Sequence, residues 1–166
     1  MRMEVGTSSV LMLPYTASSV GVARRRLMGD LSEAGVFEAT ACDAGLVLSE
    51  LISNALRHAT PLQGSVVRVA WWLDDDCLEI AVSDGGGSTM PVVNQPGHSA
   101  IGGRGLGIVD RLSLRWGVCS SSDGAGETTV WAELALSPDK TDEHSDAGSS
   151  TDRAPRRLVI TSSRDA

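Results

Sequence analysis

The amino-acid sequence predicts an α+β domain, because strand-like segments and segments with helical spacing occur along the same chain. The strand-like segments alternate apolar and polar residues, whereas two longer segments repeat apolar residues every three or four positions. The chain has 166 residues, enough for one domain with a hydrophobic core. We expect a flexible N-terminus over residues 1–8, an ordered domain over 9–136 and a disordered polar tail over 137–166.

The ordered domain is expected to begin with a short strand and a helix. Residues 10–13 are apolar and are followed by Pro14, which ends the strand. Ser18 or Ser19 is expected to cap the helix, and Gly35 to end it. One stripe of this helix is apolar and consists of Val20, Ala23, Leu27, Leu31 and Ala34.

The second helix, expected over about residues 39–58, carries polar residues beside an apolar face. Glu50, Asn54 and His58 are four residues apart, so they stack on one side of the helix. A carboxylate and an amide in apolar surroundings need partners, because desolvating them without hydrogen bonds is costly. A bound metal and a polyphosphate would supply those partners. We therefore interpret this helix as the floor of a nucleotide site.

Two strands are expected next, over residues 66–73 and 77–83, joined by a turn of three consecutive aspartates. The second strand leads into Asp84 and the glycines at positions 85–87. A carboxylate at a strand end can accept a hydrogen bond from the exocyclic amine of a base. Glycines after it, Gly86 among them, let the backbone and a ring approach closely. Taken alone, Asp84 also fits an ordinary turn.

A glycine-rich loop is expected to open the third helix, over residues 104–114. The segment GGRGLGIVDRL contains Gly103, Arg104, Gly105, Leu106 and Gly107. The free N–H groups of such a loop and of the helix N-terminus favour phosphate oxygens. Taken alone, this loop is equally a flexible connection.

The remaining segments complete the predicted domain. Residues 88–101 lack periodicity and are expected to form a mobile lid over the nucleotide. Strands are expected over 116–120 and 129–136, with Thr128 and Thr129 as hydroxyl donors at the start of the second.

The composition excludes several classes of protein. The net charge of -7 argues against nucleic acid as the main ligand, because phosphate backbones require a basic surface. No apolar run approaches twenty residues and no secretory signal pattern is present, so we expect no membrane association. The 3 cysteines are odd in number and scattered, which favours reduced thiols in a cytoplasmic protein.

The order of these motifs is more specific than any one of them. An ExxxN helix, a strand ending in DGG, a GxGxG loop opening a helix and a strand with Thr resemble the N, G1 and G2 boxes of the GHKL superfamily. This resemblance implies ATP and Mg²⁺ as ligands. It also implies the Bergerat fold, a two-layer α/β sandwich whose mixed, mostly antiparallel sheet carries helices on one face.

Within that superfamily, the segments ELISNALRHA, VSDGG, GRGL and TTVWAEL resemble the bacterial anti-sigma-factor serine/threonine kinases. Such a kinase holds a sigma factor inactive and phosphorylates a serine or threonine of an anti-anti-sigma factor. The resemblance therefore implies these two protein partners, and a homodimer is left open. A non-catalytic, ATP-gated module that sequesters a transcription regulator is the alternative.

The resemblance also implies a role for each motif residue. Glu50 matches the general base, Asn54 the Mg²⁺ ligand, and Asp84 the carboxylate that binds adenine, with Gly86 under the ring. Thr128 or Thr129 would reach the adenine through a water, and His58 supports Asn54. The lid hinge and phosphate loop match Gly103, Gly105, Leu106 and Gly107, and Arg104 is expected to pair with a phosphate.

Overall fold

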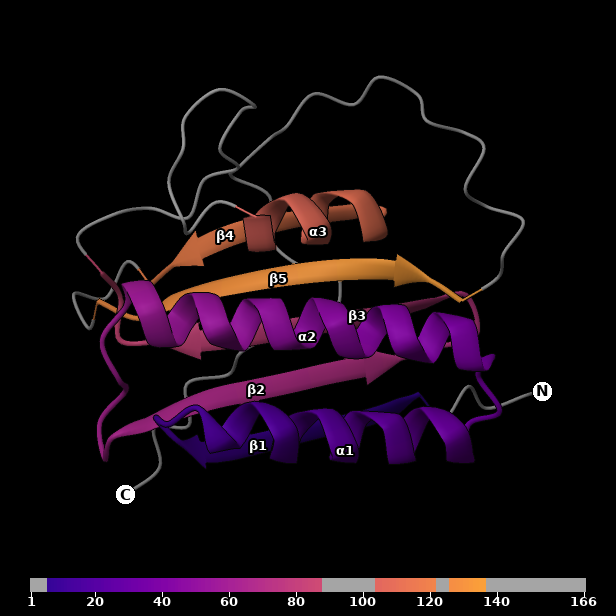
Figure 1. Ribbon diagram of the computed structural model, residues 1–166, viewed down its shortest axis with the longest axis horizontal. Helices are drawn as coiled ribbons and strands as arrows, with labels where there is room; N and C mark the ends of the chain where they lie inside the picture. Colours follow the sequence, from indigo (N-terminus) through magenta and orange to yellow (C-terminus); the bar gives the residue numbers. More distant parts are fainter. Residues whose placement is uncertain (1–5, 88–103, 122–125, 137–166) are drawn as a thin grey trace.

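The computed structural model describes residues 6–87, 104–121 and 126–136 (Figure 1). The described part of the chain forms three helices and five strands. In chain order these are β1 (Thr7–Pro14), α1 (Ser18–Glu33), α2 (Glu38–His58), β2 (Val66–Leu73), β3 (Cys77–Asp84), α3 (Arg104–Leu112), β4 (Arg115–Ser120) and β5 (Thr128–Ala135).

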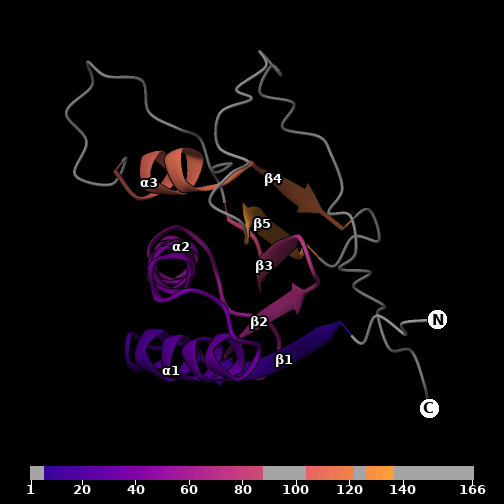
Figure 2. The same ribbon diagram turned by 90° about the vertical axis from the view of Figure 1, so that its right-hand side faces the viewer.

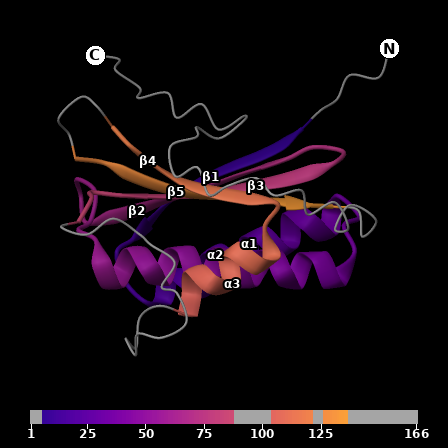
Figure 3. The same ribbon diagram turned by 90° about the horizontal axis from the view of Figure 1, so that it is seen from above.

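The five strands form one sheet in the order β1-β2-β3-β5-β4. The α+β class is confirmed, and each neighbouring pair of these strands is antiparallel. All three helices lie on the same face of the sheet, as the end-on view and the view from above both show (Figures 2 and 3). The predicted two-layer arrangement with helices on one face is therefore confirmed.

The core lies between the helices and the sheet, and it follows from strand alternation. In β2 the alternate residues Val67, Val69, Trp71 and Leu73 are buried in this core. Their neighbours point to the helix-free face, where Arg68 is half-buried. The antiparallel register carries this alternation across the sheet, because directly opposed residues share a face.

The ends of several elements differ from those expected. Strand β1 begins at Thr7, so it includes residues that were expected to belong to the flexible N-terminus. Helix α1 has Ala17 at its N-cap, because the Ser19 hydroxyl instead donates to the Pro14 carbonyl at 2.5 Å. Gly35 ends α1 as expected, with a positive φ of 73°. Helix α3 ends at Leu112, two residues earlier than expected.

Three predictions fall outside the described residues: the lid over 88–101, the position of Gly103, and the tail over 137–166. Among the described helices, none combines the length and the apolar character needed to cross a membrane.

Candidate functional site

Helix α2 presents two of its three predicted polar residues at the edge of the core. Glu50 and Asn54 are half-buried, whereas the His58 side chain is exposed. The opposite side of the helix is anchored by buried residues: Ala41, Ala44, Gly45, Val47, Leu48, Leu51, Ile52 and Ala55. Because these apolar residues fix the rotation of α2, the polar line must face along the layer of helices rather than into the sheet.

The Glu50 carboxylate lies against the first turn of α3. A Cβ atom added to Gly105 would collide with Glu50 Oε2, so glycine is what allows this approach. Gly107, one residue after Leu106, has open space around the position of a Cβ atom. The structure therefore brings Glu50 together with the glycine-rich start of α3, where helix N–H groups favour anions.

The structure describes the side chain of Leu106 but not that of Arg104. Leu106 is only 5% exposed and packs in the hydrophobic core, so its backbone N–H alone is suited to a ligand. Arg104 begins α3, and its side chain lies outside the part of the chain that the structure describes.

Asp84 ends β3 as a buried carboxylate with one oxygen held in place. It is 4% exposed, and its Oδ1 accepts a hydrogen bond from Gly86 N at 2.7 Å. Burial raises the pKa of Asp84 to about 6; the Gly86 N–H lowers that pKa, and the negative charge of Glu127 raises it further. Among the described residues, the second carboxylate oxygen has no hydrogen-bond partner, so it can serve a ligand.

The glycines after Asp84 form a turn that is packed between α2 and β5. The Thr60 N–H and hydroxyl both donate to the Gly86 carbonyl, at 2.8 and 2.9 Å, and Gly85 N donates to the Thr60 carbonyl at 2.8 Å. Gly86 has a φ of 81°, and an added Cβ would collide with the Gly126 carbonyl. Glycine is required at these positions because the backbones pack closely there. From the sequence alone, the same glycines were expected to allow a base to approach closely.

The turn also meets the end of α2. A Cβ atom added to Gly87 would collide with the carbonyl of His58. The Tyr15 hydroxyl holds the same end of α2, because it lies 2.5 Å from the Ala55 carbonyl and 2.7 Å from the Ala59 carbonyl. Burial, followed by the charge of Asp84, raises the pKa of Tyr15, which keeps its phenol protonated as the donor.

The two candidate threonines lie on opposite faces of the sheet. Thr128 pairs with Asp84 across the β3–β5 ladder and therefore shares its face. Thr129 pairs with Ser83, and their hydroxyl oxygens are 2.7 Å apart on the helix-free face. Of the two threonines, Thr128 therefore shares a face with Asp84, whereas Thr129 lies on the opposite face.

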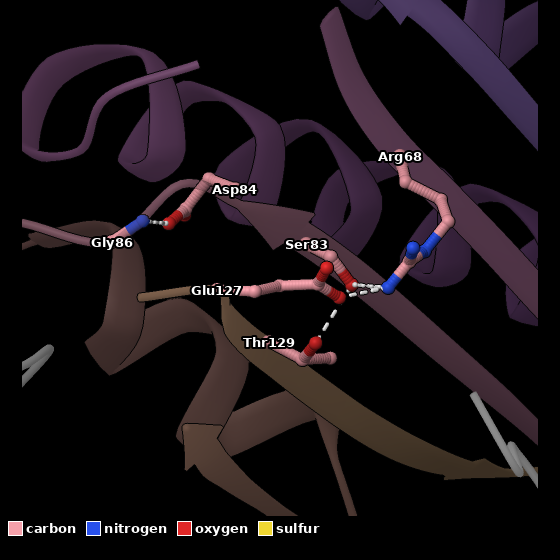
Figure 4. Close-up of polar contacts among 6 residues, drawn as sticks. All are labelled: Arg68, Ser83, Asp84, Gly86, Glu127 and Thr129. Atoms are coloured by element: carbon pink, nitrogen blue, oxygen red, sulfur yellow. Dashed lines mark hydrogen bonds and ion pairs between the residues drawn. The ribbon is translucent and has the colours of Figure 1, made fainter. Parts of the chain in front are cut away.

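A polar cluster lies behind this pair of strands and was not found from the sequence. Arg68 Nη2 donates to Ser83 Oγ at 3.2 Å and forms an ion pair with Glu127 (Figure 4). Arg68 lies on β2, Ser83 on β3, and Glu127 directly before β5, so only the pairing of these strands in the sheet brings the three together. No local motif marks Arg68 or Glu127, which explains why sequence reasoning missed them.

The chemistry of these groups fits ATP and Mg²⁺. Asp84 offers a carboxylate oxygen for an amine, and the Asn54 amide oxygen suits a hard cation that also binds phosphate oxygens. Within the described residues, no three His, Cys, Asp or Glu side chains form a metal-binding cluster. A cation at Asn54 would therefore complete its coordination with phosphate and water oxygens.

Burial of Asp84 predicts a dependence of stability on pH. Because its pKa is raised from 3.8 to about 6, the folded protein binds more protons than the unfolded chain between these values. Stability contributed by this group therefore falls as pH rises through that window. Asp84→Asn should stabilise the ligand-free protein by roughly 1–2 kcal/mol at neutral pH, allowing for solvent screening.

Urea denaturation of the wild type and of Asp84→Asn should show this gain near pH 7 and its disappearance near pH 4. A gain that is equal at both pH values would contradict the raised pKa.

Comparison with known proteins agrees with this fold. A profile of the histidine kinase-like ATPase domain matches residues 13–133. Among solved structures, the chain resembles the RsbU and RsbW domains of Rv1364c from Mycobacterium tuberculosis, with a TM-score of 0.60 and 22% sequence identity. That likeness supports the fold and covers 78% of this chain but only 32% of the other, so this chain spans about a third of its length. No curated protein matches the chain significantly.

Proposed function

Because the chain belongs to the histidine kinase-like ATPase family, we propose that it binds ATP with Mg²⁺ and transfers the γ-phosphate to a serine or threonine of an anti-anti-sigma factor. One observation carries the proposal: the Glu50 carboxylate lies against Gly105 in the first turn of α3. A base beside a phosphate-binding helix N-terminus is the arrangement that phosphate transfer to a hydroxyl requires.

Adenine is assigned to the Asp84 side of the site. The free oxygen of the buried carboxylate accepts a hydrogen bond from the exocyclic amine, while Gly86 N fixes the other oxygen. Thr128, on the same face, reaches the base through a water. The ionised form of Asp84 is the stronger acceptor, so adenine binding favours the charged state of this group.

The triphosphate is assigned to the space between α2 and α3. The N–H groups at the start of α3, including those of Gly105 and Gly107, are suited to bind phosphate oxygens. The Asn54 amide oxygen would hold Mg²⁺, which would supply positive charge to the phosphate oxygens.

The transfer step assigns one task to Glu50. The hydroxyl oxygen of the incoming serine or threonine bonds to the γ-phosphorus as the bond to the bridging β–γ oxygen breaks. Glu50 takes the hydroxyl proton, and ADP leaves with the bridging oxygen. His58 is exposed at the end of the helix, so we give it no part in this step.

The partners are assigned from the motif resemblance. The sigma factor and the anti-anti-sigma factor are the two protein partners of such a kinase, acting in the cytoplasm, and a homodimer is compatible with that role.

Incubation of the pure protein with γ-labelled ATP, Mg²⁺ and anti-anti-sigma candidates encoded nearby tests the proposal. We expect label on a serine or threonine of one candidate, and none when Mg²⁺ is omitted. If the protein binds ATP and its partner but transfers no label, the kinase proposal is wrong and the ATP-gated binding module takes its place.

A further inference from the structure

A row of polar side chains crosses three strands directly behind the adenine side of the site. Arg68 on β2 pairs in register with Ser83 on β3, which pairs with Thr129 on β5. Ser83 and Thr129 are 2% and 4% exposed, so this row is buried on the helix-free face. Asp84 and Thr128 are the next residues on the same two strands, and they face the helices.

Glu127 joins this row to the beginning of β5. Its side chain forms the ion pair with Arg68, and its backbone carbonyl accepts a hydrogen bond from Ser121 N at 2.9 Å. Its neighbour Gly126 presents the carbonyl that packs on Gly86. Arg68 thus reaches across β3 to hold a segment that contacts both the strand of Asp84 and the glycine turn (Figure 4).

We propose that the Arg68–Glu127 ion pair is a positioning device for nucleotide binding, which holds the first residues of β5 in register so that Asp84 and Thr128 converge on the base. The inference rests on the proposed ATP site and adds two residues to it. Arg68 and Glu127 are positioning residues, because they lie on the far side of the sheet from the base and act through their neighbours.

The partial burial of the Arg68–Glu127 ion pair explains why its loss should weaken nucleotide binding. The two side chains are 21% and 26% exposed, so removing one partner leaves a partly desolvated charge. The remaining side chain would move toward water and release its hold on β5. The distance between Asp84 and Thr128 would then no longer be fixed. Because small displacements weaken hydrogen bonds strongly, the hydrogen bonds to the base would weaken.

The negative charge of Glu127 gives the proposed positioning role a second measurable effect besides ATP affinity. Among the described residues, the negative charge of Glu127, just before β5, raises the pKa of Asp84, and Glu127 is itself paired with Arg68. The charge of Asp84 in turn raises the pKa of Tyr15, which follows β1. Glu127→Gln keeps the side chain's size and removes its negative charge. It should therefore lower the pKa of Asp84 from about 6.

The ion pair between Arg115 and Glu133 offers a matched control. It also joins two strands on the helix-free face, at 2.5 Å, with side-chain exposures of 23% and 4%. It lies toward the other end of β5 from Thr128. Removing it tests the loss of a comparable ion pair in the same sheet without touching the segment that packs on Gly86.

The experiment compares Arg68→Met and Glu127→Gln with Arg115→Met and Glu133→Gln. ATP affinity by calorimetry should fall about five- to tenfold in the first two folded variants and less than twofold in the controls. A carbon-detected NMR titration should show a lower Asp84 pKa in Glu127→Gln than in the wild type. Equal affinity losses in both pairs, or an unmoved Asp84 titration, would overturn the inference.

Failure of the proposed function gives a different result. If the wild type binds no ATP, the ATP site itself is wrong, and the positioning role for a nucleotide fails with it. If the wild type binds ATP and all four variants bind equally well, the ATP site stands and only the positioning role is lost.

Discussion

Replacing Glu50 by glutamine should lower the rate of phosphate transfer by roughly 10²–10⁴ and leave ATP affinity nearly unchanged. Glutamine keeps the size and polarity of the side chain that lies against Gly105, but it has no basic oxygen to take the hydroxyl proton. Single-turnover assays with labelled ATP and the unphosphorylated partner would measure the rate, and calorimetry the affinity.

A second variant on the same helix separates chemistry from helix stability. Glu38→Gln changes an exposed carboxylate in the first turn of α2 and should leave the transfer rate unchanged. Asn54→Ala should instead weaken Mg²⁺-dependent ATP binding, because it removes an oxygen ligand. Transfer at the wild-type rate in Glu50→Gln would show that another group takes the proton.

Replacing Asp84 by asparagine should weaken ATP binding about tenfold or more, a loss on the order of 1–3 kcal/mol. Two donors converge on the wild-type carboxylate in the proposed complex: Gly86 N on Oδ1 and the adenine amine on the other oxygen. Asparagine has one oxygen, so its amide must face one of these donors.

The same substitution should stabilise the free protein at neutral pH while it weakens binding, because it removes a buried charge. This opposition distinguishes lost recognition from unfolding. Asp43→Asn, at an exposed position of α2, should change neither quantity. Unchanged ATP affinity in folded Asp84→Asn would remove Asp84 from the adenine site.

Sequence periodicity was sufficient to predict these helices and strands, because each pattern is local. Alternating residues in β2 and β3, and the apolar stripe of α2, gave strands and a helix whose ends lie within a residue of those observed. The cap of α1 was wrong for a physical reason. The Ser19 hydroxyl donates to the Pro14 carbonyl instead of capping the helix, and this partner depends on how the chain passes from β1 into α1.

The candidate site was proposed from local motifs, and the ligand-binding roles of its residues stay predictions. Glu50, Asn54 and Asp84 occur in short motifs, and the structure adds the contacts of Glu50 with Gly105 and of Asp84 with Gly86. Thr128 and Thr129 could not be told apart until the β3–β5 register was known, because a shift of one residue exchanges their faces.

Residues that act through long-range contacts carried no such signal. Tyr15 meets the end of α2 across forty residues, and Arg68 meets Glu127 across fifty-nine. Their roles follow from the order of strands in the sheet, which places β2, β3 and β5 side by side.

Amide NMR spectra recorded while ATP and Mg²⁺ are added would locate the bound nucleotide without requiring catalysis. We expect saturable shifts at one ATP per chain, at the backbone amides of Gly86, Gly105 and Thr128 and at the side-chain amide of Asn54. Saturable shifts that instead cluster around Phe37, at the opposite end of α2, or no saturable shifts at all, would contradict an ATP site built on Asp84 and Glu50.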